Sequence, residues 1–543
     1  MVFARRSTTL LAAIIASCAM VLSLTACTSD NKTVVDGQTT VTSNSAGGVA
    51  VFTPSDGITL NQQTPLNKWA KRVPDLPKAL ADAGFKKGYI DHTTSDSLAK
   101  QSRAIQDFVV DHLSNNTTDD SGIAIAPDNM TLLVAPVVEA DASTRQYGDY
   151  ISQNLSTNDA TDGEATSDGE SSEDDSSKDD SSNTESDSTA SDEQAQAVDR
   201  LVSSLKLAKE SGMHVVLRGN SIEGYKPDAF VKFSDAQTIG KLQAEKMVSK
   251  LKLDKASKDN PKYIEVLLPY TAVDEKGNAN DSTFAQEAFR GIWQVLGSYY
   301  QKGVVESPSG TLDGKSTEND WQAVAYDAAE EGSTAKVLDK RLAKTDGQST
   351  LTRIDGIITM NDYIASEVVK ELDDLGYTGS AADINPQITI SGIVGNITGK
   401  KDLSRDAVPD PIKSPENDNA NDSSSSDDDA DEDTSASDKD RDSQWPLVTG
   451  YGAYVSNIPS IVNGKQWMTG MEDRQTIATD IAQACAKLNK DEALNSMPSI
   501  RNSEVGGVKK IPTISEPLLA VSASNLKSAL IDPGYISLAD AGL

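Results

Sequence analysis

Cys27 is the residue whose surroundings most directly predict a chemical event. Arg5 and Arg6 precede an almost wholly apolar run over residues 9–24, and a small-residue stretch then ends at Ala26. This order is typical of a secretory signal peptide that is removed after export. The apolar run is also short for a membrane-spanning helix. Cleavage after Ala26 leaves Cys27, with its thiol, as the first residue of the mature chain.

The segment around Cys27 resembles the lipobox of bacterial lipoproteins, in which this cysteine receives the lipid. The resemblance implies a mature protein on the extracytoplasmic face of the cell membrane, held there by acyl chains. An ordinary secretory peptide followed by an incidental cysteine is the alternative. We therefore expect a signal peptide at residues 1–26 and a flexible tether at residues 27–47.

The acidic composition excludes several classes of function. The chain has 543 residues and a formal net charge of −32. Nucleic-acid binding needs a basic surface that displaces counterions, so we expect no nucleic-acid partner. The same charge disfavours electrostatic adhesion to an anionic bilayer, which leaves the lipid as the anchor. Three histidines, and Cys485 as the one cysteine after Cys27, make a cysteine–histidine metal site implausible. We expect no metal and no cofactor.

Two acidic segments are unsuited to a packed core. Residues 158–193 hold fourteen acidic side chains against Lys178, and residues 413–443 hold twelve against three basic ones. Because apolar residues are scarce and like charges repel, neither segment offsets the entropy lost on ordering. We predict two disordered insertions. The acidic run at 427–433 lacks the central glycine and the closing glutamate of a calcium-binding loop, so a solvated spacer is favoured.

Elsewhere, short apolar runs alternate with amphipathic stretches, which predicts an α/β fold. Two such blocks, with no glycine-rich dinucleotide turn in either, predict two lobes with a cleft between them. Ligands of such sheets bind beyond the carboxyl ends of the strands. We expect strands at 49–52, 89–92, 132–138, 214–217, 229–233, 263–268, 303–306, 354–360 and 446–450, and helices at 74–83, 97–113, 201–212, 284–300, 321–342 and 362–375.

Several motifs together carry a resemblance to a known family. Residues 354–362 lead into a helix that ends at 376–377, and residues 461–469 lead into Glu472-Asp473-Arg474. These stretches resemble the type I solute-binding proteins of sugar ABC importers, especially the xylose and multiple-sugar branch. The resemblance spans roughly residues 48–543 apart from the insertions, and it rests on the order of the motifs. Lys68-Trp69, residues 239–244 and Pro533-Gly534-Tyr535 also match.

The resemblance implies a type I periplasmic-binding-protein fold, with two Rossmann-like three-layer lobes joined by a three-strand hinge. The lobes of this fold close on a ligand by hinge motion. The implied divisions are an N-terminal lobe at 48–224, a C-terminal lobe at 225–464, a return to the N-terminal lobe at 465–500, and a hinge crossing with the C-terminal segment at 501–543.

Sugar recognition needs aromatic faces against C–H patches and planar polar groups that each bond two hydroxyls. The resemblance places Trp321, Asn361 and Asn280 in this part of the site, and Trp69 follows the first strand. Structural roles remain open for each residue. Trp321 can be a core or helix-start residue, and either asparagine can cap the helix that follows it.

The charged part of the site departs from the family pattern. Where relatives have Asp-Arg at a strand end, this chain has Gly219 and Asn220, and Glu472 stands where they have a lysine. Each lost charge-assisted bond is worth roughly 1.5–3 kcal/mol. Arg218 is a natural partner for an acidic ligand, or else a surface ion-pair residue. The predicted ligand-binding set is Trp69, Arg218, Asn220, Asn280, Trp321, Asn361, Asp362 and Tyr451.

Three classes of function follow. The first is a monomeric solute-binding lipoprotein that delivers a sugar-like ligand to an ABC transporter permease. The second is a binding-fold lipoprotein without transport activity, in a sensory or surface-interaction role, which the missing charged groups favour. The third is an enzyme. It is disfavoured because no Ser-His-Asp set and no glycine-rich phosphate loop stands at a predicted strand end.

Overall fold

The structure is a computed structural model, and it describes part of the chain. The described residues are 32–35, 38–41, 46–55, 69, 74–115, 123–138, 152–156, 184–273, 282–328, 332–343, 351–381, 444–515 and 518–543. Cys27, Asn280 and the acidic segment 413–443 therefore lie outside the described residues.

The first lobe is built on a seven-stranded sheet in the order β18-β19-β10-β8-β6-β3-β4. All neighbouring strands are parallel except β18 and β19, which pair antiparallel. The strands are β3 Gly48–Pro54, β4 Ile90–Ser95, β6 Met130–Val134, β8 His214–Arg218, β10 Ala229–Val231, β18 Ile500–Val505 and β19 Val508–Ile514.

The second lobe is built on a six-stranded sheet in the order β13-β11-β15-β16-β17-β20. Only β20 runs antiparallel to its neighbour. The strands are β11 Lys262–Val266, β13 Val305–Glu306, β15 Gly356–Ile358, β16 Leu447–Tyr451, β17 Met468–Glu472 and β20 Leu518–Ser522. The predicted fold class, two α/β lobes built on mostly parallel sheets, is confirmed.

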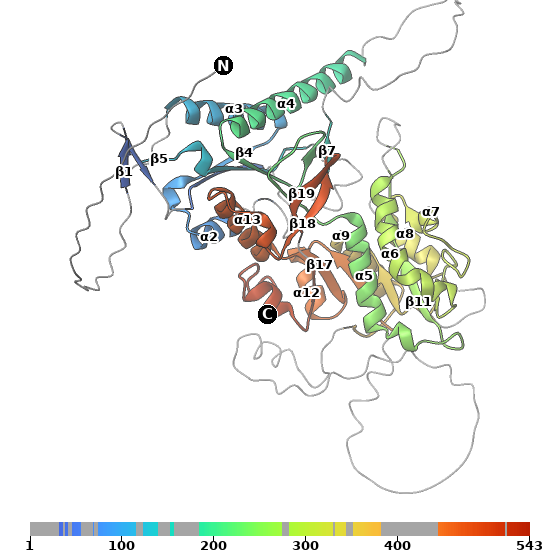
Figure 1. Cartoon of the computed structure of the whole chain (residues 1–543). Coiled ribbons are helices and arrows are strands. Elements are labelled where there is room, and N and C mark those ends of the chain that lie inside the picture. The colour runs from blue at the N-terminus through green and yellow to red at the C-terminus, as the bar shows by residue number, and fades with distance from the viewer. Residues whose placement is uncertain are drawn as a thin grey trace, which may run out of the picture.

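Helices cover both sheets (Figure 1). Strand side chains alternate between faces, so Leu132 and Val215 pack against α3 and α4, whereas Leu133 and Val216 pack against α2 and α13. In the second lobe α5 packs along α6, and α8 packs along α9. The helices are α2 Asp75–Asp82, α3 Leu98–Asn115, α4 Thr184–Glu210, α5 Ala236–Lys250, α6 Thr283–Gln301, α7 Trp321–Val324, α8 Ser333–Arg341, α9 Asp362–Asp374, α12 Ile458–Val462 and α13 Arg474–Leu488.

Small sheets complete the structure. The N-terminal strands β1 and β2 pair with each other, and β2 pairs with β5 of the first lobe, so part of the segment expected to be a free tether forms strands. Two short parallel pairs, β7 with β9 and β12 with β14, lie outside the main sheets. Their strands are β1 Lys32–Val35, β2 Gln38–Val41, β5 Ile123–Ala124, β7 Asn154–Leu155, β9 Ser221–Ile222, β12 Leu268–Pro269 and β14 Ala325–Tyr326.

The chain crosses between the lobes three times, and each crossing leaves the carboxyl end of a strand. β10 ends at Val231 and α5 begins at Ala236, while β17 ends at Glu472 and α13 begins at Arg474. The third crossing joins β19 to β20. Because these connections are short, the carboxyl edges of the two sheets must lie next to each other. Ser234 of the first crossing donates two hydrogen bonds to Glu472 Oε1, of 2.8 and 2.9 Å, which ties two crossings together.

Some elements and boundaries differ from the expectations. The single helix expected at 321–342 is wrong, because the chain turns after Val324 to pair β14 with β12 and starts α8 beyond Gly332, whose φ is +76°. α4 begins at Thr184 rather than near 201, so residues 184–193 of the first acidic segment are helical. Residues 229–231 pair in the first sheet and residues 468–472 in the second, so the chain changes lobe later than 225 and 465.

Asn489, at the C-terminal end of α13, fixes this helix to the first sheet. Its amide donates to the carbonyls of Ala46 and Gly48 at 2.8 and 3.0 Å, and it accepts from Thr131 Oγ1 at 2.6 Å. The residue is 3% exposed, so all three bonds are buried. They secure the helix that begins directly after the second crossing.

Replacing Asn489 with alanine should lower the free energy of unfolding by about 2–3 kcal/mol, because buried partners lose their hydrogen bonds. Asn525, whose amide donates to Ala520 O at an exposed site, is the matched control. Its alanine variant should lose less than about 1 kcal/mol. Urea denaturation measures both, and equal losses would contradict the anchoring role of Asn489.

Candidate functional site

Two aromatic rings and a guanidinium gather at the carboxyl edge of the first sheet. The rings of Trp69 and Phe233 lie 5.6 Å apart and pack with Ala135 in a small buried cluster. Arg218, the last residue of β8, places its guanidinium carbon 5.3 Å from the Trp69 ring and 5.9 Å from the Phe233 ring. We call Trp69, Ala135, Arg218 and Phe233 the first-lobe ring group. Ala135, Arg218 and Phe233 follow or end three neighbouring strands, β6, β8 and β10, whereas Trp69 comes after β3 in the chain.

The ring group depends on a glycine at position 219. Gly219 has φ of +78°, and a Cβ atom there would lie 2.3 Å from the Phe233 ring. Any other residue would displace the ring or strain the backbone. This close approach gives a physical reason for glycine at position 219.

The amide of Asn220 is engaged within the first lobe. Its Nδ2 donates to Pro136 O at 2.9 Å, and its Oδ1 accepts from the backbone N–H of Gln153 at 2.9 Å. The side chain is 4% exposed. Asn220 therefore holds two loops together beside the ring group.

A buried carboxylate organises the carboxyl edge of the second sheet. Asp362 is fully buried. One oxygen accepts from Tyr454 N at 2.9 Å and Thr469 Oγ1 at 2.8 Å, and the other accepts from Gln466 Nε2 at 2.7 Å. Asn457 Nδ2 donates to the backbone carbonyl of Asp362. We call these five residues the Asp362 network.

Burial raises the pKa of Asp362 to about 6, even though its hydrogen bonds favour the charged form. The site also excludes a side chain at position 450, because a Cβ on Gly450 would lie 2.2 Å from Asp362 Oδ1. Tyr451, the next residue, ends β16 and is 3% exposed. Asp362 and Tyr451 thus come from adjacent strand ends.

Asn361 caps α9. Its Oδ1 accepts from the backbone N–H of Ile364 at 2.8 Å, and the side chain is 1% exposed. Met360, just before it, has φ of +65°, a left-handed conformation that is uncommon for a side chain of this kind. The strand end of β15 is therefore held in a constrained turn by the cap and by the network that follows it.

Trp321 lies at the start of α7, against Tyr270. The two rings are 5.1 Å apart and nearly perpendicular. Tyr270 follows β12, whose partner strand β14 follows α7, so the pair belongs to the rim beyond the carboxyl end of β11. Trp321 also packs on the main core of the second lobe and is 9% exposed.

The structure groups the described members of the predicted set by lobe. Trp69 lies with Arg218, while Asn361, Asp362 and Tyr451 lie at adjoining strand ends. Seven residues of these groups were not predicted from sequence: Ala135, Phe233, Tyr270, Tyr454, Asn457, Gln466 and Thr469. Ala135, Phe233 and Tyr270 come just after the carboxyl ends of β6, β10 and β12, and that position was the available signal.

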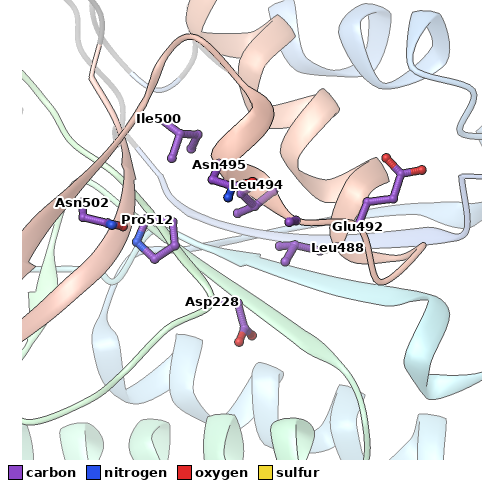
Figure 2. Close-up of a pocket in the computed structure, with 9 residues that line it drawn as sticks. Asp228, Leu488, Glu492, Leu494, Asn495, Ile500, Asn502 and Pro512 are labelled. Atoms are coloured by element: carbon purple, nitrogen blue, oxygen red, sulfur yellow. The ribbon is translucent and has the colours of Figure 1, made fainter.

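A shallow hollow lies at the other end of the first sheet (Figure 2). It has a volume of about 310 Å³ and is formed by the end of α13, the loop beyond it and the β18–β19 hairpin. Asp228 stands at the amino end of β10, and Ile500 pairs with Ile514, the last residue of β19. Its lining consists of Asp228, Leu488, Glu492, Ala493, Leu494, Asn495, Ile500, Asn502 and Pro512.

Within the described residues, no group of three or more His, Cys, Asp or Glu side chains is placed to hold a metal ion. In the same part of the chain no helix combines the length and apolarity needed to span a bilayer.

Comparisons give distant structural likenesses only. No family model and no curated protein sequence matches the chain. A solute-binding protein of an ABC transporter from Clostridium phytofermentans, with bound β-D-glucose, is 17% identical with a TM-score of 0.44, over 91% of this chain and 99% of that one. A carbohydrate transporter solute-binding protein from Chloroflexus aurantiacus, in complex with D-glucose, is 18% identical with a TM-score of 0.42, over 92% and 98%. Likenesses at this distance assign no ligand to this chain.

The raised pKa of Asp362 predicts a pH-dependent contribution to stability. Between about pH 4, the usual carboxyl range, and about 6, the folded state binds this proton more tightly than the unfolded state. The contribution of Asp362 to the free energy of unfolding therefore falls as pH rises through this window, and is constant above it.

Asp362→Asn removes this titration. The stability difference between the wild type and Asp362→Asn should change between pH 4 and 6 and stay level from pH 7 to 8, as measured by urea denaturation. Thr469→Val, which removes one donor and leaves the carboxyl, should retain a pH-dependent difference from Asp362→Asn. If the stability difference between the wild type and Asp362→Asn stays level from pH 4 to 8, the pKa of Asp362 is not raised in the folded protein.

Proposed function

We propose that this protein binds a sugar or sugar-like small molecule between its two lobes and delivers it to the permease of an ABC importer. The observation that supports this most is the meeting of two carboxyl edges. Both sheets bring aromatic rings and planar polar groups to the ends joined by the three crossings. Ligands of α/β sheets bind beyond these ends.

The ring pairs suit a sugar. Trp69 with Phe233 in the first lobe, and Tyr270 with Trp321 in the second, offer apolar faces against which the C–H patches of a sugar ring pack. Arg218 lies against the first-lobe rings, and Tyr451 ends β16 at the carboxyl edge of the second sheet. They supply guanidinium and hydroxyl groups for the sugar hydroxyls. A ligand between the lobes contacts both pairs, so its binding energy favours closure about the crossings.

The proposed setting is the extracytoplasmic face of the membrane. Cys27 carries the lipid, the mature chain acts as a monomer, and the permease and the sugar are its partners. The proposal involves no catalysis, no cofactor and no nucleic acid. The net charge of −32 suits a protein held at the membrane by acyl chains rather than by attraction to anionic lipids.

One observation favours a second candidate, a transport-inactive lipoprotein with a sensory or surface-interaction role. Asn220, Asn361 and Asp362 already bond to groups of their own lobe. Polar groups that already make these hydrogen bonds have fewer donors and acceptors left for sugar hydroxyls. The two candidates differ in whether any sugar binds tightly.

Thermal denaturation and calorimetry with D-glucose, D-allose, D-xylose and L-arabinose test the first candidate. A sugar present at a hundred times its Kd should stabilise the folded protein by about 2.7 kcal/mol. Trp321→Ala should weaken that sugar's binding by roughly tenfold or more, because a stacking face is lost.

Trp445→Ala is the matched control. Trp445 is also buried in the second lobe but precedes the amino end of β16, and its Nε1 donates to Lys465 O. Its variant should lose stability and keep the wild-type affinity. Equal loss of affinity in both variants would place the ligand elsewhere, and no stabilisation by any sugar would favour the second candidate.

Lipidation is tested separately. Cells fed a radioactive or clickable palmitate should label the full chain, and Cys27→Ala should abolish the label and release the protein from the membrane fraction. Cys485→Ala, which changes a buried thiol, should leave the label unchanged. A labelled Cys27→Ala variant would contradict this part of the proposal.

A further inference from the structure

The C-terminal turn Pro533-Gly534-Tyr535 belongs to the second lobe by its packing. Tyr535 packs on a hydrophobic cluster that includes Met471 of β17, Val521 of β20 and Ile461 of α12. The preceding helical turn, Lys527–Ile531, adds Leu530 to the same cluster. The turn therefore moves with the second lobe.

This turn contacts the start of α13, which belongs to the first lobe. The Arg474 guanidinium carbon lies 3.9 Å from the centre of the Tyr535 ring. The backbone N–H of Gln475 donates to Tyr535 Oη at 3.0 Å, and Gln475 Nε2 donates to Pro533 O at 3.1 Å. The second lobe thus supplies an acceptor to one of the N–H groups in the first turn of a first-lobe helix.

Arg474 is itself held in the first lobe. Its Nε lies 3.5 Å from Asp75 Oδ2 at the start of α2, and the residue is 4% exposed. α13 packs along α2, and Ile477 of α13 and Leu80 of α2 belong to the same hydrophobic cluster. A movement of the second lobe relative to α2 and α13 must therefore carry Tyr535 away from a fixed guanidinium.

We propose that Arg474, Gln475, Pro533 and Tyr535 form an interlobe latch that sets the angle between the lobes. Asp473 is the one residue between β17 and α13, so rotation at this crossing changes the distance between the helix start and the C-terminal turn. The latch makes Arg474 and Tyr535 positioning residues for ligand binding. Its effect on affinity rests on the proposed function, whereas its effect on the lobe angle does not.

The latch contacts are made in the described arrangement of the lobes. They favour that lobe angle, and their loss increases the population of other angles. Since the apparent Kd equals the intrinsic Kd divided by the fraction of molecules at the binding-competent angle, a wider spread of angles weakens the binding of a ligand that contacts both lobes.

Electron–electron distance measurements between spin labels test the latch without a ligand. Labels at Gln106→Cys on α3 and Lys340→Cys on α8 are exposed and report on separate lobes. Cys18 and Cys27 are replaced by serine. Cys485 is retained because it is fully buried, and burial raises the pKa of its thiol to about 12, which suppresses labelling.

Tyr535→Ala should give a broader distance distribution than the wild-type background. Tyr535→Phe keeps the ring under Arg474 and removes the acceptor of the Gln475 N–H, and Arg474→Lys keeps the charge and removes the planar group, so each should give a smaller change. Tyr299→Ala is the control, since Tyr299 bonds to Asp254 and lies under Lys302 within the second lobe. Its distribution should match the wild type.

Affinity for D-glucose is the second readout. Tyr535→Ala should weaken it by about tenfold, the scale set by losing one cation–π contact and one hydrogen bond, and Tyr299→Ala should leave it unchanged. If wild-type protein does not bind D-glucose, the distances alone decide the latch. Unchanged distances in Tyr535→Ala overturn the proposal whatever its melting temperature, and if that variant does not fold, unchanged distances in Tyr535→Phe and Arg474→Lys do so.

Discussion

The structure depends on one constraint, the shortness of the three connections between the lobes. β10, β17 and β19 all leave their sheets at the carboxyl end, and a few residues later the chain is already part of the other lobe. Connections of this length oblige the two carboxyl edges to lie together. The ring group, the Asp362 network and the Tyr270–Trp321 pair are neighbours of the crossings for this reason, although they come from distant parts of the sequence.

The two edges differ in how they are built. The first-lobe ring group is an aromatic and cationic cluster, and it depends on a glycine at position 219 that admits Phe233. The second edge is a buried polar network in which the carboxylate of Asp362 accepts hydrogen bonds from three residues and its backbone carbonyl accepts one from a fourth. A fully satisfied network of this kind rigidifies its surroundings. Loss of any partner leaves a buried polar group without a hydrogen bond in the low-dielectric interior. The second edge is therefore rigid, and adaptation to a ligand must come from the lobe angle.

Local patterns in the sequence were sufficient for most elements. The apolar runs at 214–217 and 446–450 became β8 and β16 almost without change, because buried parallel strands read as continuous hydrophobic stretches. The single helix predicted at 321–342 was wrong because β14 pairs with β12, a segment far away in sequence, and this pairing overrides the helical periodicity. α4 starts earlier than expected because a helix continues into the acidic segment.

The site was predictable in outline and not in detail. Strand ends identified Arg218, Asn361 and Tyr451 as residues of the carboxyl edges. The partners of Asp362 could not be found in the same way, because Tyr454, Gln466 and Thr469 reach it from another strand and loop about a hundred residues away. Hydrogen bonds of that separation follow from the tertiary fold and leave no local pattern.

The most direct test of the account is a crystal structure of the protein soaked with whichever sugar stabilises it most. The account predicts electron density for the sugar between the lobes, in contact with the Tyr270–Trp321 pair on one side and the first-lobe ring group on the other. Density bound to one lobe alone, or in the hollow beside Leu488, would contradict it.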